Sequence, residues 1–455
     1  MNPLDDLHDY QWAGIDYLLG RPKALQTDDM GLGRTAQALV ASDRRGIDGL
    51  PVLVLCPNGL REHWARQIAR WVPHLSYIVL EGSTDERQAQ ITAQVKSKTQ
   101  PHFTIVNFES SWRIKIEQFR WKTVIVDEGH KLANRDSKIS TSARRAVHRA
   151  KYAIIMSGTP ARDRISDLWH LLHMIDKTTF SSYWAFANEF CEVYHNGWGW
   201  VVGGLLNEKE ADLQRLLEPY AIRRLKKDFL TLPPKTEIDE WLELPDDVRV
   251  MYERMKTDLV AELGDQSIFA PTALAALTRL RQMVIDPSLP FGPSTEPLRG
   301  VKADAVVAIL RRGREQKRKV VVFSTFSQAI DRLERRLLDE GFAALKITGG
   351  VDVTQRSVLL DDFKRFENTV LVMTTTAGGT GLDLTAASVL VHLNQGWSLA
   401  DNLQADDRIY RLGQTQETTI IRLLARSSID EGVRRSLEWK LKDANRAIRV
   451  RDVLD

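Results

Sequence analysis

Short, almost continuously apolar runs recur along the chain and constrain its fold more than any other feature. Strands buried on both faces of a parallel sheet have this pattern. The stretch 59–72 between two such runs places Leu60, Trp64, Ile68 and Trp71 on one helical stripe. Alternating strands and helices predict a doubly wound α/β domain. The runs of this first part are PVLVLCP (51–57), FTIVNF (103–108), TVIVDE (123–128) and YAIIMSGT (152–159).

The alternation stops between about 177 and 300 and then returns. We interpret the interrupted part as a helical insert with a crossing linker, and the charged end of the chain as a terminal helix. The returning runs predict a second α/β lobe: KVVVFSTF (319–326), AALKITG (343–349), VLVMTTT (370–376), SVLVHLN (388–394) and TIIRLLA (419–425). The predicted parts are 1–176, 177–300, 301–430 and 431–455.

Composition bounds the class of protein. A chain of 455 residues exceeds the roughly 250–300 residues of a single core. It contains no run of the ~18 apolar residues that a membrane span needs, and its start, MNPLDDLHDYQWAG, has no signal-peptide pattern. We therefore expect a cytoplasmic protein, or a nuclear one in a eukaryote, without a membrane partner. Two cysteines exclude a disulfide framework, and a net charge of +3 permits an anionic partner without requiring one.

The stretch DDMGLGRT (28–35) has the composition of a phosphate-binding loop that opens a helix. Such a loop needs small residues, a cation for the phosphates and a hydroxyl for Mg²⁺. Gly31 and Gly33 are the small residues, and Thr35 supplies the hydroxyl. Arg34 stands where lysine is usual, and Asp28 stands where the strict pattern has glycine. Alone, this loop is equally compatible with a structural turn.

Two carboxylates end the strand pattern TVIVDEGH, 93 residues after Arg34. Nucleotide hydrolases place a magnesium-binding aspartate and a water-orienting glutamate in this way. Asp127 and Glu128 are the candidates, and the alternative is a solvated Asp-Glu pair. Further along, QADDRIYRLGQ (404–414) is expected to set Arg408 and Arg411 on one helical face, either as arginine fingers or as a solvated basic surface.

Nine blocks in order along the chain resemble those of a Swi/Snf-type ATPase. They include LHDYQWAGIDYLL (7–19), VDEGHKLAN (126–134), MSGTPARDRISDLWHLLHMI (156–175), TTTAGGTGLDLTAASVLVHLNQGW (374–397) and QADDRIYRLGQ (404–414). This family consists of superfamily-two motors with two RecA-like lobes that translocate on double-stranded DNA. The likeness covers residues 7 to about 430. The insert, with FANEFCEVYHNGWGWVVGG, is similar to the annealing-helicase, fork-remodelling branch.

The resemblance implies ATP and Mg²⁺ as cofactors and assigns roles to residues. Gln11 would read adenine, Thr35 and Asp127 would hold Mg²⁺, and Glu128 would orient the attacking water. The loop that would hold the phosphates comprises Asp29, Met30, Gly31, Leu32, Gly33, Arg34 and Thr35. His130 would couple this site to Ser157 and Thr159, and the second lobe would contribute Gly381, Gln404, Arg408 and Arg411.

The implied partner is duplex or branched DNA, bound mainly through phosphates because a motor that moves along any sequence cannot depend on base edges. Family position suggests Pro57, Asn107, Ser324, Thr325 and Thr376 as contacts. The basic runs RRLKK (223–227) and RRGREQKRK (311–319) add either phosphate affinity or, more commonly, solvated surface.

Arg34 is the departure from the family pattern that bears on catalysis. Arginine is longer and planar where lysine is a compact point charge, and a misplacement of about 1 Å can cost roughly a hundredfold in rate. The sequence therefore predicts nucleotide binding without efficient turnover. The alternatives are a nucleotide-gated DNA-binding module and, less favoured by QADDRIYRLGQ, an RNA helicase.

Overall fold

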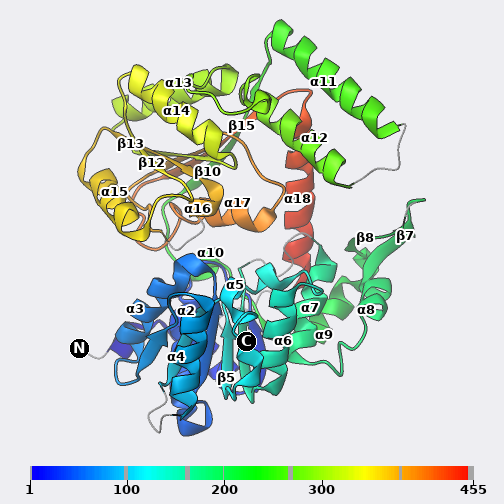
Figure 1. The fold of residues 1–455 in the computed structure, drawn as a ribbon, viewed down its shortest axis with the longest axis vertical. Coiled ribbons are helices and arrows are strands. Elements are labelled where there is room, and N and C mark those ends of the chain that lie inside the picture. The colour runs from blue at the N-terminus through cyan, green and yellow to red at the C-terminus, as the bar shows by residue number, and fades with distance from the viewer. Residues whose placement is uncertain are drawn as a thin grey trace. The chain divides into compact units, whose positions relative to one another are not determined.

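The computed structural model describes residues 3–96, 101–158, 164–197, 199–264, 270–378 and 382–448 (Figure 1). The chain divides into two compact units. The first comprises Met1–Leu230 and Lys440–Asp455, and the second comprises Thr231–Trp439. The stretch 177–300 is therefore shared between the two units.

The first unit is built on a parallel seven-stranded sheet with the order β3-β4-β2-β5-β6-β1-β9. All four apolar runs predicted in this part form strands, and β2 and β4 are completely buried. The strands are β1 (Lys23–Gln26), β2 (Val52–Cys56), β3 (Tyr77–Val79), β4 (Phe103–Asn107), β5 (Thr123–Val126), β6 (Tyr152–Met156) and β9 (Ala221–Ile222).

Helices connect these strands, as parallel pairing requires. In α3, Trp64, Ile68 and Trp71 are buried as the helical stripe predicts, and Leu60 directly precedes the helix. The helices are α1 (Asp9–Leu19), α2 (Arg34–Arg44), α3 (Arg61–Trp71), α4 (Thr84–Lys96), α5 (Phe108–Ser111), α6 (Lys138–Arg149), α7 (Ile165–Ile175), α8 (Tyr183–Phe190), α9 (Glu210–Leu217) and α10 (Lys226–Phe229).

The insert is not purely helical, which corrects the expectation from the sequence. An antiparallel hairpin of β7 (Cys191–His195) and β8 (Trp200–Leu205) follows α8. Its turn contains Asn196 and Gly197, and Gly197 has a φ of 91°, which suits glycine. Aromatic and β-branched residues favour the flanking strands.

The second unit contains a parallel six-stranded sheet with the order β10-β15-β14-β11-β13-β12. Five strands coincide with the predicted runs, and two apolar clusters, one containing Val322 and the other Phe323, cover opposite faces. The strands are β10 (Lys235–Leu242), β11 (Val320–Ser324), β12 (Ala343–Ile347), β13 (Thr369–Thr374), β14 (Val389–His392) and β15 (Thr418–Ala425). The prediction of two α/β lobes with parallel sheets is thus confirmed.

The helices of the second part are α11 (Asp246–Gly264), α12 (Ala270–Met283), α13 (Val301–Glu315), α14 (Ser327–Asp339), α15 (Val353–Arg365), α16 (Thr375–Gly378), α17 (Leu399–Asp406) and α18 (Ile429–Ala447). The last, α18, is the expected terminal helix. Its final turns belong to the first unit, where Asp443 accepts a hydrogen bond from the Leu205 N–H at 3.1 Å.

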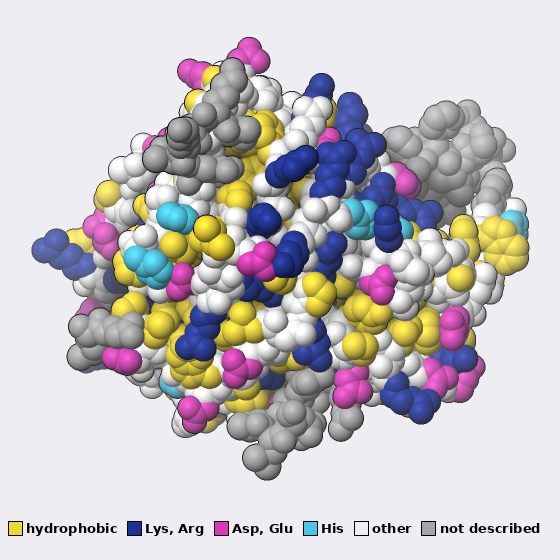
Figure 2. All heavy atoms as spheres, turned by 90° about the horizontal axis from the view of Figure 1, so that it is seen from below, with side chains coloured by type: hydrophobic (Ala, Val, Ile, Leu, Met, Phe, Trp, Pro, Cys, Tyr) yellow, Lys and Arg dark blue, Asp and Glu magenta, His cyan; other side chains and the backbone are white. Residues whose placement is uncertain are grey.

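Two further observations concern the surface of the described residues. None of their helices is both long and apolar enough to cross a membrane. Figure 2 shows Lys and Arg side chains gathered on one face, with Asp and Glu side chains more widely scattered over it.

Candidate nucleotide-binding site

The carboxyl ends of neighbouring strands bring the predicted nucleotide-binding residues of the first unit together. β5, β6 and β1 are adjacent in the sheet. The phosphate loop follows β1, Asp127 and Glu128 follow β5, and Ser157 follows β6. Open parallel α/β sheets bind ligands at this edge.

Two glycines shape the loop between β1 and α2. Gly31 and Gly33 have φ values of 92° and 75°, and Gly33 is the residue at which α2 begins. A Cβ atom on Gly33 would lie 2.0 Å from Nε2 of Gln11. That amide nitrogen donates to the carbonyl oxygen of Leu32 at 3.3 Å. Gln11 and the loop are therefore packed together at the N-terminus of α2, the end of a helix that favours anions.

A buried ion pair explains why Asp28 replaces the glycine of the strict pattern. Arg224 donates to both carboxylate oxygens of Asp28, at 3.1 and 2.5 Å, and to Oε1 of Gln37 at 2.7 Å. The side chains of Asp28 and Arg224 are 0% and 3% exposed. The backbone N–H of Lys226 donates to Asp29 at 3.0 Å.

The RRLKK run is consequently not solvated surface in its first part, because Arg223, Arg224 and Lys226 are buried. Sequence reasoning missed Arg224 as a residue of this site. The available signal was the pair of unusual features, an acidic residue inside a phosphate loop and arginines beside an apolar Ala-Ile step.

Arg34 is the second residue of interest in the loop. It is the first residue of α2 and is 8% exposed. Its Nη1 atom is buried without a hydrogen-bond partner among the described residues. A Cβ atom on Gly158 would lie 3.4 Å from this Nη1 atom, so the guanidinium reaches the end of β6. A buried cationic group with an unsatisfied N–H group suits an anionic ligand.

Asp127 is buried at the end of β5 and retains two hydrogen bonds. Its Oδ2 accepts from Nε1 of Trp64 and its Oδ1 from the Glu128 N–H, both at 2.9 Å. Burial, with the neighbouring Glu128 carboxylate, raises the pKa of Asp127 to about 6, although Arg34 and the bond from Trp64 act in the opposite direction. A raised carboxyl pKa in a strand-end cluster is typical of a functional site.

Glu128, His130 and Ser157 form a connected chain from β5 to β6. Nδ1 of His130 lies 3.3 Å from Oε2 of Glu128 and 3.1 Å from Oγ of Ser157. Glu128 has a φ of 52°, and a Cβ atom on Gly129 would lie 2.6 Å from Cγ2 of Ile155. Only glycine allows this close approach. Thr159, the third residue of the expected coupling group, lies outside the described residues.

The predicted residues of the second unit lie on and after α17. Gln404 and Arg408 are buried and Arg411 is half-buried. The expectation that both arginines share a helical face is wrong, because α17 ends at Asp406. The carbonyl of Arg408 accepts from the Leu384 N–H at 3.1 Å instead of continuing the helix. Gly381 lies outside the described residues.

Side chains that sequence reasoning did not single out hold this turn in place. Asp406 lies 2.7 Å from Nε2 of His392 and 3.6 Å from Nη2 of Arg422. Nε2 of Gln414 donates to the carbonyls of Ala387 and Ile409. The motif is therefore anchored to β14 and β15.

The expected DNA contacts also stand at strand ends. Pro57 directly follows β2, and Asn107 is the last residue of its neighbour β4. Ser324 is the last residue of β11, and Thr325 directly follows it. Asn107 accepts from Arg87 at 3.0 Å, Ser324 donates to Asn394 at 2.7 Å, and Thr325 accepts from Asn394 at 2.7 Å. Thr376 is exposed. Three of these side chains are thus partly engaged within the protein.

Two family models match the chain. One, the SNF2-related domain, matches residues 10–289, and the other, the helicase conserved C-terminal domain, matches residues 301–413. The chain belongs to the SNF2-related family. The resemblance drawn from the nine sequence blocks is therefore confirmed.

This SNF2-related chain is similar to curated proteins of bacteria, yeast and plants. It is 27% identical to an uncharacterised ATP-dependent helicase of Mycoplasma genitalium, over 95% of this chain and 41% of the relative. It is 27% identical to the transcription regulatory protein SNF2 of Saccharomyces cerevisiae, over 93% and 27%. It is 28% identical to the ATP-dependent DNA helicase DDM1 of Arabidopsis thaliana, over 96% and 61%. The SNF2-related chain spans less than two thirds of each of these relatives.

Among solved structures, the SNF2-related chain is similar to the SWI2/SNF2 ATPase core of Sulfolobus solfataricus in complex with double-stranded DNA. The identity is 21% and the TM-score is 0.46, with 98% of this chain and 97% of that chain covered.

Proposed function

We propose that the chain is an ATP hydrolase that binds and moves along double-stranded or branched DNA. The observation that carries the proposal is one sheet edge where the phosphate loop, Asp127 and the Glu128–His130–Ser157 chain meet. Membership of the SNF2-related family and relatives named ATP-dependent helicases support it.

In the proposed reaction, the loop N–H groups and the N-terminus of α2 bind the phosphates of ATP. Glu128 accepts a hydrogen bond from the attacking water and orients it, while His130 holds Glu128 relative to Ser157. Gln404, Arg408 and Arg411 remain predicted contributors to the stabilisation of transition-state charge.

The residues fit a magnesium ion. Mg²⁺ is usually held by one or two protein oxygens together with substrate phosphates, and Asp127 and the Thr35 hydroxyl are oxygens of that kind. The buried carboxylate of Asp127, whose charge burial makes costly, would be stabilised by a cation beside it. The ion would supply neutralisation of phosphate charge when bound.

Arg34 is proposed to slow turnover. Its buried guanidinium reaches toward Gly158 at the end of β6, where it fills space beside the predicted γ-phosphate position. The site then binds nucleotide but holds the phosphate out of line with the water on Glu128.

The branched-DNA part of the proposal depends on the insert. The segment that resembles fork-remodelling proteins forms α8 and the β7–β8 hairpin, on which Tyr194 and Trp200 are 53% and 65% exposed. Exposed aromatic rings stack on unpaired bases. Such bases occur at forks and not within an intact duplex.

A phosphate-release assay tests the proposal. The chain and its Arg34→Lys form are each measured without nucleic acid and with single-stranded DNA, duplex DNA, fork DNA and RNA. We expect Arg34→Lys to raise the DNA-stimulated rate on the order of tenfold to a hundredfold. A rate indifferent to DNA in both forms would reject the proposal, and stimulation by RNA alone would identify an RNA-dependent enzyme. Tight DNA binding without turnover in both forms would indicate a nucleotide-gated clamp.

A further inference from the structure

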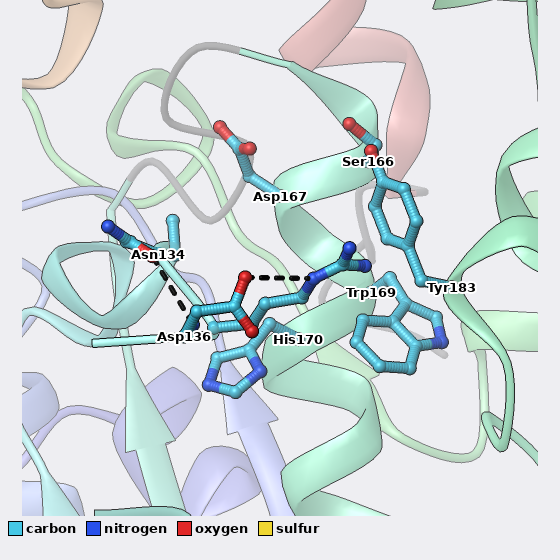
Figure 3. A pocket seen from close by; sticks show the side chains of 9 residues that line it. Asn134, Asp136, Ser166, Asp167, Trp169, His170 and Tyr183 are labelled. Carbon is cyan, nitrogen blue, oxygen red and sulfur yellow. Dashed lines mark hydrogen bonds and ion pairs between the residues drawn. The ribbon is translucent and has the colours of Figure 1, made fainter. Parts of the chain in front are cut away.

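A cavity in the first unit is separate from the nucleotide-binding residues. Its volume is about 230 Å³. Figure 3 shows Tyr183 and Trp169 on one side and Asn134 and Asp136 on the other. The wall comes from three segments: the loop before α6, the first turns of α7, and the start of α8.

His170 gives this cavity an unmet chemical need. The residue is 1% exposed and lines the cavity, and neither ring nitrogen has a hydrogen-bond partner among the described residues. Burial, with the nearby cations Arg144 and Arg135, lowers the pKa of His170 to about 3. The ring is therefore neutral near pH 7 and offers one donor and one acceptor. A ligand that satisfies it must carry both an acceptor and a donor.

Aromatic rings form the second feature of the cavity. The rings of Trp169 and Tyr183 are 5.6 Å apart at an angle of 82°. The guanidinium of Arg135 lies 4.1 Å from the centre of the Tyr183 ring. Arginine planes and aromatic rings are the groups on which flat heterocycles stack in proteins.

Charge selects among possible ligands. Asp136 and Asp167 line the cavity, and Asp136 is 87% exposed with Arg135 3.7 Å away. The nearby cations Arg135 and Arg144 offset these two carboxylates, so the cavity has no strong net charge that favours an ion. Lysine and arginine side chains carry donors alone and leave the donor nitrogen of His170 unsatisfied. A neutral ring with donors and acceptors satisfies both ring nitrogens of His170.

Size restricts the ligand further. Pockets for drug-sized ligands measure roughly 300–1,000 Å³. The volume of about 230 Å³ suits a single ring system and leaves a sugar and phosphate outside. The exocyclic amine of a base is a good donor to a carboxylate, and its ring nitrogens and carbonyls are acceptors.

We propose that this cavity binds a neutral nucleobase, presented by an unpaired nucleotide of a DNA strand. The nucleobase chemistry is argued from the cavity alone, whereas the strand as its source rests on the proposed function. α8 leads directly from Tyr183 to the β7–β8 hairpin, so a strand that passes the exposed rings of the hairpin stays on the same supersecondary element.

The test uses DNA duplexes with one 2-aminopurine, either paired or in a single-nucleotide bulge, and the full chain. Stacking in the cavity changes the emission of the bulged probe, and we expect Tyr183→Ala to remove most of this change. Tyr183→Phe keeps the ring and should retain it. Tyr77→Ala is the matched control, because Tyr77 is 42% exposed and does not line the cavity. The thermal unfolding of each variant is compared to exclude a folding defect.

Three outcomes would overturn the proposal or part of it. An unchanged bulge signal in Tyr183→Ala would reject the cavity as the site. If a lysine- and arginine-rich peptide binds in a way that depends on Tyr183, and the 2-aminopurine duplex gives no signal, the ligand is cationic. Binding of free 2-aminopurine riboside that depends on Tyr183, without a bulge effect, would retain the nucleobase and reject the strand. Duplex-stimulated phosphate release by the Arg34→Lys form, measured in parallel, separates these failures from failure of the proposed function.

Discussion

A single carboxyl group, that of Asp127, combines structural cost with proposed function. Its side chain is buried at a strand end, where the sheet presents it beside Glu128 and the phosphate loop. A carboxylate there is costly to the folded protein until a cation approaches. The same environment that raises its pKa therefore favours a ligand that carries positive charge.

Asp127→Asn should remove the pH-dependent cost of this carboxylate in the ligand-free protein, although its single amide oxygen can accept only one of the two hydrogen bonds from Trp64 and Glu128. The pKa of about 6 in the folded state exceeds the ordinary value of 3.8, so ionisation above pH 6 destabilises the folded form. At about 1.4 kcal/mol for each pKa unit, this cost is at most about 3 kcal/mol. It should shrink as pH falls from about 6 to about 4, because Asp127 then binds its proton in the folded state.

Urea denaturation of both proteins without nucleotide or Mg²⁺, at about pH 7 and about pH 4, measures this difference. Asp361→Asn is the control, since its side chain is exposed on α15. A difference that is equal at the two pH values would contradict the argument.

At the scale of elements, the connection between α2 and β9 depends on Arg224. Arg224→Ala leaves Asp28 charged and buried without its partner, which typically costs 3–5 kcal/mol, that is about a third or more of the stability of an ordinary domain. We expect a loss of about 3–5 kcal/mol in the free energy of unfolding, together with weaker nucleotide binding.

Arg215→Ala provides the comparison for this variant. Arg215 pairs with Asp212 at 2.6 Å, but its side chain is 76% exposed. Exposed pairs contribute about 0–1 kcal/mol. Equal destabilisation by the two substitutions, measured by chemical denaturation, would show that burial of the Asp28 pair does not matter.

How far the elements could be predicted depended on which faces they bury. β2, β4, β5 and β6 are covered on both sides, so their sequences are continuously apolar and were recognised. β10 escaped recognition because it is an edge strand, KTEIDEWL, whose polar residues are exposed or half-buried. The β7–β8 hairpin was missed because the whole stretch from about 177 to 300, which lacks the repeated alternation of strands and helices, was interpreted as a helical insert.

Some residues of the candidate site could likewise be predicted from the sequence, and others could not. Motif spacing located the phosphate loop and the Asp127–Glu128 pair, since their chemistry requires particular residue types in order. It did not reveal Arg224 or the Trp64–Asp127 bond, because these partners lie 196 and 63 residues apart and meet only through the sheet order. The Arg408 and Arg411 geometry was misjudged because tertiary bonds end α17 early.

For the whole molecule, the net charge of +3 is too small to explain the proposed affinity for DNA by itself. In the proposed complex, local groups of Lys and Arg, such as those gathered in Figure 2, would contact the phosphates. We expect the affinity for duplex DNA to fall on the order of tenfold or more between about 50 and 200 mM salt. Fluorescence anisotropy of a labelled duplex measures this, and an affinity insensitive to salt would argue against phosphate contacts.

The bond between the Lys226 N–H and Asp29 has a consequence for how the chain transmits a signal. Asp29 belongs to the phosphate loop, and the first unit ends at Leu230, from which the chain enters the second unit. A nucleotide that displaces Asp29 must either break this hydrogen bond or move the backbone just before this crossing. The bond therefore offers a route by which nucleotide binding in the loop affects the linker through the polypeptide chain itself.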